Sequence, residues 1–339
     1  MNRSVTLQLW LIAALVPAAF LILMTDAGGS DFTSFWAAGK QALTGADVYA
    51  HTATQDAATA FVYPPHALFF FVPFALLPVI PSYWLWNAAT ASLFYWGARP
   101  YCPKGFPRIL AVLTPAALIC FTFGQSGLLF GALWLLAFRG KWAAVALLTF
   151  KPHLGLIGIL SLKDRRSVTY CAILVVVLVA ASAAIFGPGS WVEFVSNSIG
   201  QGDRMGRHKR WLFAGVSPAI AYGLVGWAPF AIAGALLLAR RVNVFTAATA
   251  SLIISPYGFH YDMPVVCLGF GLLIYERWDE MLLRHRIPVA LGFLSPVIAI
   301  GGAWWMPPIL LWALWGQVSL QYDILASPLE PAAELQPQI

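Results

Sequence analysis

One lysine stands alone in a long apolar stretch of this 339-residue chain. Lys151 is the only acidic or basic side chain apart from one histidine between Trp142 and Leu162, and Pro152 follows it directly. An ammonium group at membrane depth is costly unless it meets an anion, so it marks a functional position. The anion can be a phosphate group of a ligand or a buried carboxylate such as Asp262. A lysine that reaches out to the membrane surface is the third alternative.

A carboxylate follows the first apolar segment. Asp31 lies in a polar stretch from Asp26 to Pro65 that contains four aspartates against the single Lys40. A carboxylate at such a position can accept a proton from a hydroxyl group. It can also simply cap the helix predicted over residues 32–43, since Asp is a favoured N-cap residue. Asp26 is the rival acid in the same stretch.

Two further groups of polar residues interrupt the apolar segments. His260 falls in a short break over residues 255–262, where a histidine can donate to a phosphate oxygen or a hydroxyl, or pack structurally. Arg204 and Arg207 belong to a basic run over residues 203–210. Guanidinium forks suit phosphate, although this run can also contact lipid head groups. We find no phosphate-cradling glycine loop, serine nucleophile elbow or pair of zinc ligands in the sequence.

The elements that must position these residues are membrane helices. The chain is 60% hydrophobic and only 10% charged, with a mean hydropathy of +0.75, which excludes a soluble globule or a fibrous protein. We predict an all-α polytopic membrane protein of about ten to twelve helices, some short and re-entrant. Residues 1–320 form one transmembrane domain with an outer loop over 25–66, and residues 321–339 form a short acidic tail. The net charge of +6 comes from basic residues in the loops between the apolar segments, and it does not indicate a protein that binds nucleic acid.

The distribution of basic residues predicts the topology. We expect a retained first span over 7–24 with a cytoplasmic N-terminus, and an interfacial helix over 64–81 that returns to the outer side. This arrangement places 14 of the 20 Lys and Arg residues inside, whereas counting 64–81 as a span would place 13 of them outside. The segment over 142–162 then becomes a re-entrant pair broken at Lys151, and residues 187–215 become a long outer loop. All the polar groups described above gather on the outer side.

Five short motifs occur in order between about residues 26 and 265. They are Asp31-Phe32-x-x-Phe35-Trp36-Ala37-Ala38-Gly39-Lys40, Gly45-x-x-Val48-Tyr49, Phe61-Val62-Tyr63-Pro64-Pro65, Phe123-Gly124-Gln125 and Phe150-Lys151-Pro152. In this order they resemble glycosyltransferase family 87. The resemblance implies an integral-membrane enzyme of the GT-C fold that uses a polyprenyl-phosphate sugar as donor.

The resemblance also implies roles for individual residues. Asp31 becomes the general base that takes the proton of the acceptor hydroxyl. The residues expected to bind the donor phosphate or sugar are Tyr63, Gln125, Lys151, Arg204, Arg207 and His260. Many enzymes of this fold carry two adjacent acidic residues where this chain has Ser30-Asp31, so we expect no metal, and no cofactor is implied.

The expected reaction moves a hexose, with mannose favoured, to a lipid or glycan acceptor on the outer face of the cytoplasmic membrane. The expected partners are therefore this donor, this acceptor and membrane lipids. The alternative from another class is a lipid or solute transporter in which Lys151 and His260 line a pathway. A transporter is expected to show inverted repeats and polar groups on both sides, and the sequence shows neither.

Overall fold

The computed structural model describes Gln8, Trp10 and residues 30–49, 61–207 and 215–320. These residues form α-helices and 3-10 helices without a strand, and an isolated β-bridge joins Gly215 to Phe259. Three of the described helical stretches are long and apolar enough to cross a membrane: Arg165–Phe186, Pro218–Arg240 and Leu283–Gly301. The predicted all-α polytopic membrane fold is thereby confirmed. The first span predicted over 7–24, apart from Gln8 and Trp10, lies outside the described residues, as do Asp26 and the acidic tail.

The helices near the N-terminal end form a bent layer. Helix α2 (Ser30–Thr44) packs on α3 (Leu68–Ala75), which the 3-10 turn Pro65–Ala67 precedes and α4 (Val79–Ala98) follows. The α3 stretch and the α4 stretch meet at an angle of 117°. At 1.5 Å per residue, α3 rises only about 12 Å and cannot cross a bilayer core of ~30 Å. Residues 64–81 therefore do not form one straight span, and the interfacial position expected for them stays a prediction.

The central helices are short and enclosed by protein. They are α5 (Pro115–Phe123), α6 (Gly127–Ala137), α7 (Trp142–Leu147), α8 (Pro152–Gly155), α12 (Val244–Ile254) and α13 (Pro264–Arg277). Every residue of α6 is buried, and so are the first twelve residues of α13. Helix ends at membrane depth are tolerated only in such protein surroundings. The predicted break at Lys151 is confirmed, since 3-10 turns over Leu148–Phe150 and Leu156–Ser161 flank it on either side of α8.

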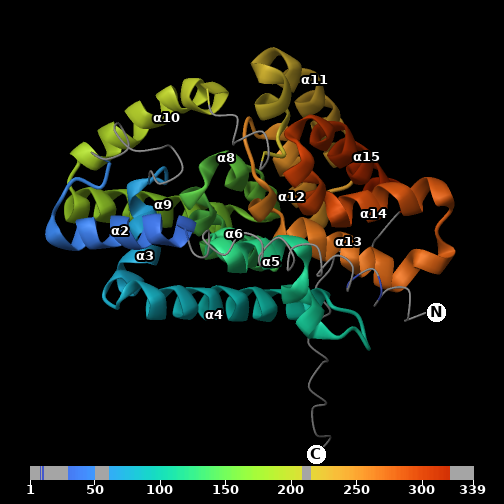
Figure 1. Ribbon diagram of the computed structural model, residues 1–339, viewed down its shortest axis with the longest axis horizontal. Helices are drawn as coiled ribbons and strands as arrows, with labels where there is room; N and C mark the ends of the chain where they lie inside the picture. The colour runs from blue at the N-terminus through green and yellow to red at the C-terminus, as the bar shows by residue number, and fades with distance from the viewer. Residues whose placement is uncertain (1–7, 9, 11–29, 50–60, 208–214, 321–339) are drawn as a thin grey trace, which may run out of the picture.

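The C-terminal helices form a second group, at the right of Figure 1. They are α11 (Pro218–Arg240), α14 (Leu283–Ile298) and α15 (Met306–Ser319). Helix α15 packs on both α11 and α14, and α11 and α15 also pack on α12. Helix α11 is kinked at Gly223, whose φ of 72° is not helical. Gly302, whose φ is 135°, separates α14 and its 3-10 extension Ala299–Gly301 from the turn Ala303–Trp305 that precedes α15.

The prediction of a long loop over 187–215 was wrong, because most of this segment is helix, whereas its location on the outer side stays a prediction. Helix α9 (Arg165–Phe186) ends at Gly187, and α10 (Gly189–Arg207) begins two residues later. Figure 1 shows α10 running along the upper left edge of the molecule. Trp191 anchors it, because its ring stacks on His66 at 5.8 Å between centroids and its Nε1 donates to Ser182 Oγ at 3.1 Å. The glycines and the charged run at the end of this segment obscured its helical periodicity.

The predicted topology can be tested with single cysteines at exposed positions. We expect Ala46→Cys to react with a membrane-impermeant maleimide in intact spheroplasts, and Lys104→Cys and Lys141→Cys to react only after lysis. Background labelling stays low because the four native cysteines, Cys102, Cys120, Cys171 and Cys267, are all buried. Labelling of Lys104→Cys from outside would show that residues 64–81 span the membrane and would invert the sides of all later loops.

Candidate active site

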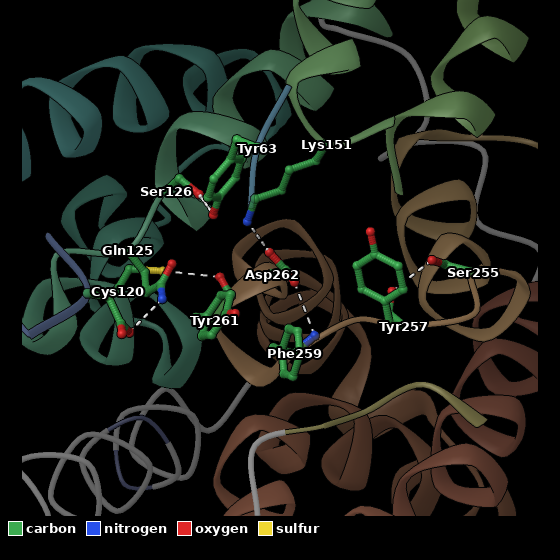
Figure 2. Close-up of polar contacts among 11 residues, drawn as sticks. Tyr63, Cys120, Gln125, Ser126, Lys151, Ser255, Tyr257, Phe259, Tyr261 and Asp262 are labelled. Atoms are coloured by element: carbon green, nitrogen blue, oxygen red, sulfur yellow. Dashed lines mark hydrogen bonds and ion pairs between the residues drawn. The ribbon is translucent and has the colours of Figure 1, made fainter. Parts of the chain in front are cut away.

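A buried ion pair lies at the centre of the molecule. The Nζ atom of Lys151 lies 2.5 Å from Oδ1 of Asp262, and both side chains are almost completely buried. Figure 2 shows the two side chains pointing toward each other. The ammonium also lies 5.3–6.0 Å from the ring centroids of Tyr63, Phe130, Phe150 and Tyr261. Aromatic faces attract a cation at such distances, so the charge is held by one carboxylate within an aromatic enclosure.

The break in the helix places Lys151 at this point. Pro152 has no N–H group to donate to the preceding turn, so the helix is interrupted there. The carbonyl of Lys151 accepts from Leu154 N at 3.1 Å and from Gly155 N at 2.7 Å, which starts α8. The lysine is thus the junction between two short helical pieces, with its side chain directed to the protein interior.

Asp262 links this lysine to the turn that contains His260. Its second oxygen, Oδ2, accepts from the backbone N–H of Phe259 at 3.0 Å and closes the 3-10 turn His260–Asp262. His260 lies in this turn and is buried. The carboxylate therefore neutralises Lys151 and fixes the local backbone at the same time. The sequence named Asp262 only as an alternative partner for Lys151, and the structure shows this pairing.

A four-residue corner between α5 and α6 forms the second half of the site. Gly124 ends α5 in the left-handed conformation, with φ 64°. A Cβ atom at this position would lie 2.5 Å from the Cβ of Phe32, so Gly124 also permits α2 to pack closely against the corner. The carbonyl of Gly124 accepts from Trp86 Nε1 at 3.0 Å, which fixes the corner to α4.

The next three residues of the corner each face a different part of the site. Gln125 Nε2 donates to Oδ2 of Asp31 at 2.6 Å. Ser126 Oγ and the hydroxyl of Tyr63 are hydrogen-bonded at 3.0 Å (Figure 2). Gly127 leaves room for the carbonyl of Tyr261, which a Cβ atom would overlap. The corner thus connects α2, the segment before α3 and the His260 turn.

The surroundings of Asp31 raise the proton affinity of its carboxyl group. It lies in the first turn of α2 and is partly exposed. Burial raises the pKa of its carboxyl from 3.8 to about 6, although the hydrogen bond from Gln125 and the charge of Lys151 act in the opposite direction. A base whose pKa lies just below the working pH is mostly ionised and still takes up a proton readily. Perturbed carboxyl groups of this kind concentrate at functional sites.

The structure brings together most of the residues predicted from the sequence. Asp31, Tyr63, Gln125 and Lys151 are connected through the corner and the ion pair, and His260 lies in the adjoining turn. We expected Gln125 to bind the donor phosphate or sugar, but its side chain donates a hydrogen bond to Asp31.

The structure leaves the two arginine candidates untested and gives two further histidines defined contacts. Arg204 and Arg207 lie at the end of α10, and their side chains are outside the described part of the chain. His66 pairs with Thr149 Oγ1 at 3.1 Å, and His153 stacks on Tyr257 at 3.8 Å between ring centroids. Both histidines therefore have structural contacts. The roles predicted for Arg204 and Arg207 stay predictions.

Sequence reasoning missed Ser126 and Tyr261 as parts of this arrangement. Both flank residues that the sequence did single out, Gln125 and His260, so proximity to a motif was the available signal. Among the described residues, no three His, Cys, Asp or Glu side chains gather into a metal-binding group.

The chain was compared with known families, curated proteins and solved structures. The sequence model of glycosyltransferase family 87 matches residues 61–256, which is more than half of the chain. No curated protein and no solved structure matches the chain.

The ion pair makes a prediction about stability. Asp262→Ala leaves the Lys151 ammonium buried without its counter-charge, and breaking a buried pair in this way typically costs about 3–5 kcal/mol. We expect a large fall in the apparent Tm of the purified protein in detergent. The double variant Lys151→Met/Asp262→Leu should recover most of the loss, because it removes both charges.

The exposed pair Arg277–Glu280 provides the control for this prediction. Glu280→Gln should cost no more than about 1 kcal/mol, as is usual for surface pairs. An Asp262→Ala protein as stable as Glu280→Gln, or a double variant less stable than Asp262→Ala, would contradict the structural role of the pair.

Proposed function

The chain belongs to glycosyltransferase family 87, and we propose on this premise that it transfers a hexose from a polyprenyl-phosphate sugar to a lipid or glycan acceptor. The proposed hexose is mannose, and the proposed location is the outer face of the cytoplasmic membrane. One observation carries the proposal: the Asp31 carboxyl, with a pKa of about 6, is linked to the cationic Lys151 through the α5–α6 corner and Tyr63 in one network. The reaction needs a base for the acceptor and a cation for the donor, and this network contains both.

The proposed step is a direct displacement at C1 of the sugar. Asp31 Oδ1 takes the proton of the acceptor hydroxyl while the hydroxyl oxygen forms a bond to C1. The bond between C1 and the phosphate oxygen breaks, and its electron pair leaves with the polyprenyl phosphate. The leaving phosphate is stable as an anion, so the step requires no general acid. Attack opposite the leaving group inverts the configuration at C1.

Lys151 provides the proposed contact to the donor phosphate. An ammonium group has three N–H donors, of which Asp262 takes one, so the others can be donated to phosphate oxygens. Tyr63 and His260 lie beside the ion pair and are the next candidates for the donor phosphate or sugar. Arg204 and Arg207 on α10 are proposed to contact the same phosphate or that of a phospholipid-linked acceptor. No cofactor takes part in the proposed step, and membership of the family argues against the transporter alternative.

The proposal predicts the behaviour of Asp31→Asn. Asparagine keeps the size of aspartate, and its amide oxygen can still accept the hydrogen bond from Gln125, but it cannot take up the proton. We expect turnover to fall by about 10²–10⁴-fold, measured as loss of a polyprenyl-phosphate sugar, with an unchanged apparent Tm. Several polyprenyl-phosphate sugars offered in parallel will identify the hexose.

Asp47→Asn is the matched control, because Asp47 lies in the same polar segment and its Oδ1 accepts a hydrogen bond from the backbone N–H of Tyr49 at 2.8 Å. Its activity should stay close to that of the unaltered protein. A folded Asp31→Asn protein with full activity would refute the assignment of the base.

The role of Lys151 predicts a separate effect on donor binding. We expect Lys151→Met to raise the donor KM by at least about 30-fold, since loss of a buried charged hydrogen bond costs roughly 2–5 kcal/mol. Lys40→Met is the control, because Lys40 is exposed and likewise lies over an aromatic ring, that of Trp36 at 5.5 Å. Equal and small changes in donor KM would show that Lys151 serves only the fold.

A further inference from the structure

The two oxygens of the Asp31 carboxyl have different surroundings. Oδ2 accepts the hydrogen bond from Gln125 Nε2 at 2.6 Å. Oδ1 accepts no hydrogen bond from any residue that the structure describes. The carboxyl is therefore fixed on one side and available on the other, which is the arrangement that a positioned base requires.

The chemistry of the two groups determines the orientation of the amide. An ionised carboxylate only accepts hydrogen bonds, so the NH₂ end of Gln125 must face Asp31. The other end, Oε1, is buried and has no partner among the described residues. The bond to Asp31 is thus the one hydrogen bond that this side chain makes within the described part of the chain. Burial of an amide for a single contact needs an explanation, because buried polar groups are normally satisfied.

The backbone of Gln125 is held rigidly behind this contact. Its N–H donates to the carbonyl of Cys120 at 3.0 Å, and the preceding Gly124 is fixed by Trp86. Phe32, which follows Asp31 in α2, packs directly against Gly124. The donor and the acceptor of the hydrogen bond therefore belong to two elements that contact each other next to the bond itself.

We propose that Gln125 is the positioning residue of the base: its Nε2 holds Oδ2 of Asp31 so that Oδ1 faces the acceptor hydroxyl. This inference rests on the proposed function. It assigns Gln125 to the acceptor side of the reaction and separates its role from that of Lys151 on the donor side.

The proposal has a measurable consequence for pH dependence. The titratable groups that act on Asp31 are Lys151, from the helix break, and Tyr63 and Tyr261, from the segment before α3 and the His260 turn. The tyrosines are neutral at the pH of interest, so Lys151 and the Gln125 hydrogen bond are what favour the ionised form. Removal of that bond raises the pKa of Asp31, and the base then becomes protonated at a higher pH.

The test is the pH profile of kcat/KM for the purified enzyme with its polyprenyl-phosphate sugar. We expect activity to be lost below a midpoint near pH 6, where Asp31 becomes protonated. Gln125→Met keeps the length of the side chain without the N–H group, and should move this midpoint upward by about one pH unit. Gln125→Glu places a second carboxyl beside Asp31 and should move it further. Both variants should lower kcat about tenfold or more at pH 6 and leave the donor KM unchanged.

Gln317→Met in α15 is the matched control, because Gln317 is also a buried amide without a hydrogen bond to the described residues. It should leave the midpoint unchanged. A folded Gln125→Met protein with the midpoint of the unaltered enzyme would overturn the inference. If Gln125→Met does not fold, Gln125→Glu decides the question by the same measurement.

The failure of this inference can be distinguished from that of the proposed function. If Asp31→Asn is inactive while the Gln125 variants keep the midpoint, only the positioning role is refuted. If Asp31→Asn is active, the proposed base itself is refuted and the positioning role is refuted with it.

Discussion

A buried positive charge needs a negative partner, and this constraint organises the centre of the molecule. The Lys151 ammonium lies among aromatic rings where water cannot neutralise it, so the chain must bring a carboxylate to it. Asp262, 111 residues further along, meets this need and closes its own turn with the other oxygen. The ion pair therefore links the broken helix to the His260 turn. Neither element is regular, and both are stable because protein surrounds them.

The α5–α6 corner holds the carboxylate of Asp31 in position, as the ion pair holds the ammonium group of Lys151. Its two glycines admit close neighbours, Phe32 on one side and the carbonyl of Tyr261 on the other. Its two polar residues bond to Asp31 and Tyr63. A short helix on each side keeps the corner inside the protein, where the positions of its side chains are determined by packing. The close packing of the backbone at Gly124 and Gly127 thus fixes the positions of the side chains in the site, and few hydrogen bonds are needed to do so.

Local features of the sequence predicted much of this arrangement. The apolar composition predicted the membrane fold, and the Lys151-Pro152 pair predicted the broken helix. The helix predicted over 32–43 is present as α2, but it begins at Ser30, so Asp31 lies in its first turn and is not its N-cap residue. The sequence offered Asp262 only as one of three alternatives for Lys151 and did not pair Gln125 with Asp31. These partners lie 111 and 94 residues away, and no local periodicity specifies them. Helix α10 was missed for a different reason: its glycines lower helix propensity, and contacts such as that of Trp191 with His66 stabilise it instead.

The two charged groups of the proposed reaction have partners of different kinds, and the difference suits their roles. Lys151 only has to stay positive, and a full negative charge on Asp262 favours that state. Asp31 has to take up a proton, and a cation in direct contact would stabilise its ionised form so strongly that it would become a poor base. A neutral amide orients the carboxylate with a much weaker effect on its proton affinity, and the more distant Lys151 lowers its pKa only in part. Burial outweighs both effects and keeps the pKa of Asp31 near 6, where the carboxyl is ionised at neutral pH and still basic enough to act. Gln125 is therefore better suited than a lysine or arginine to the position beside the base.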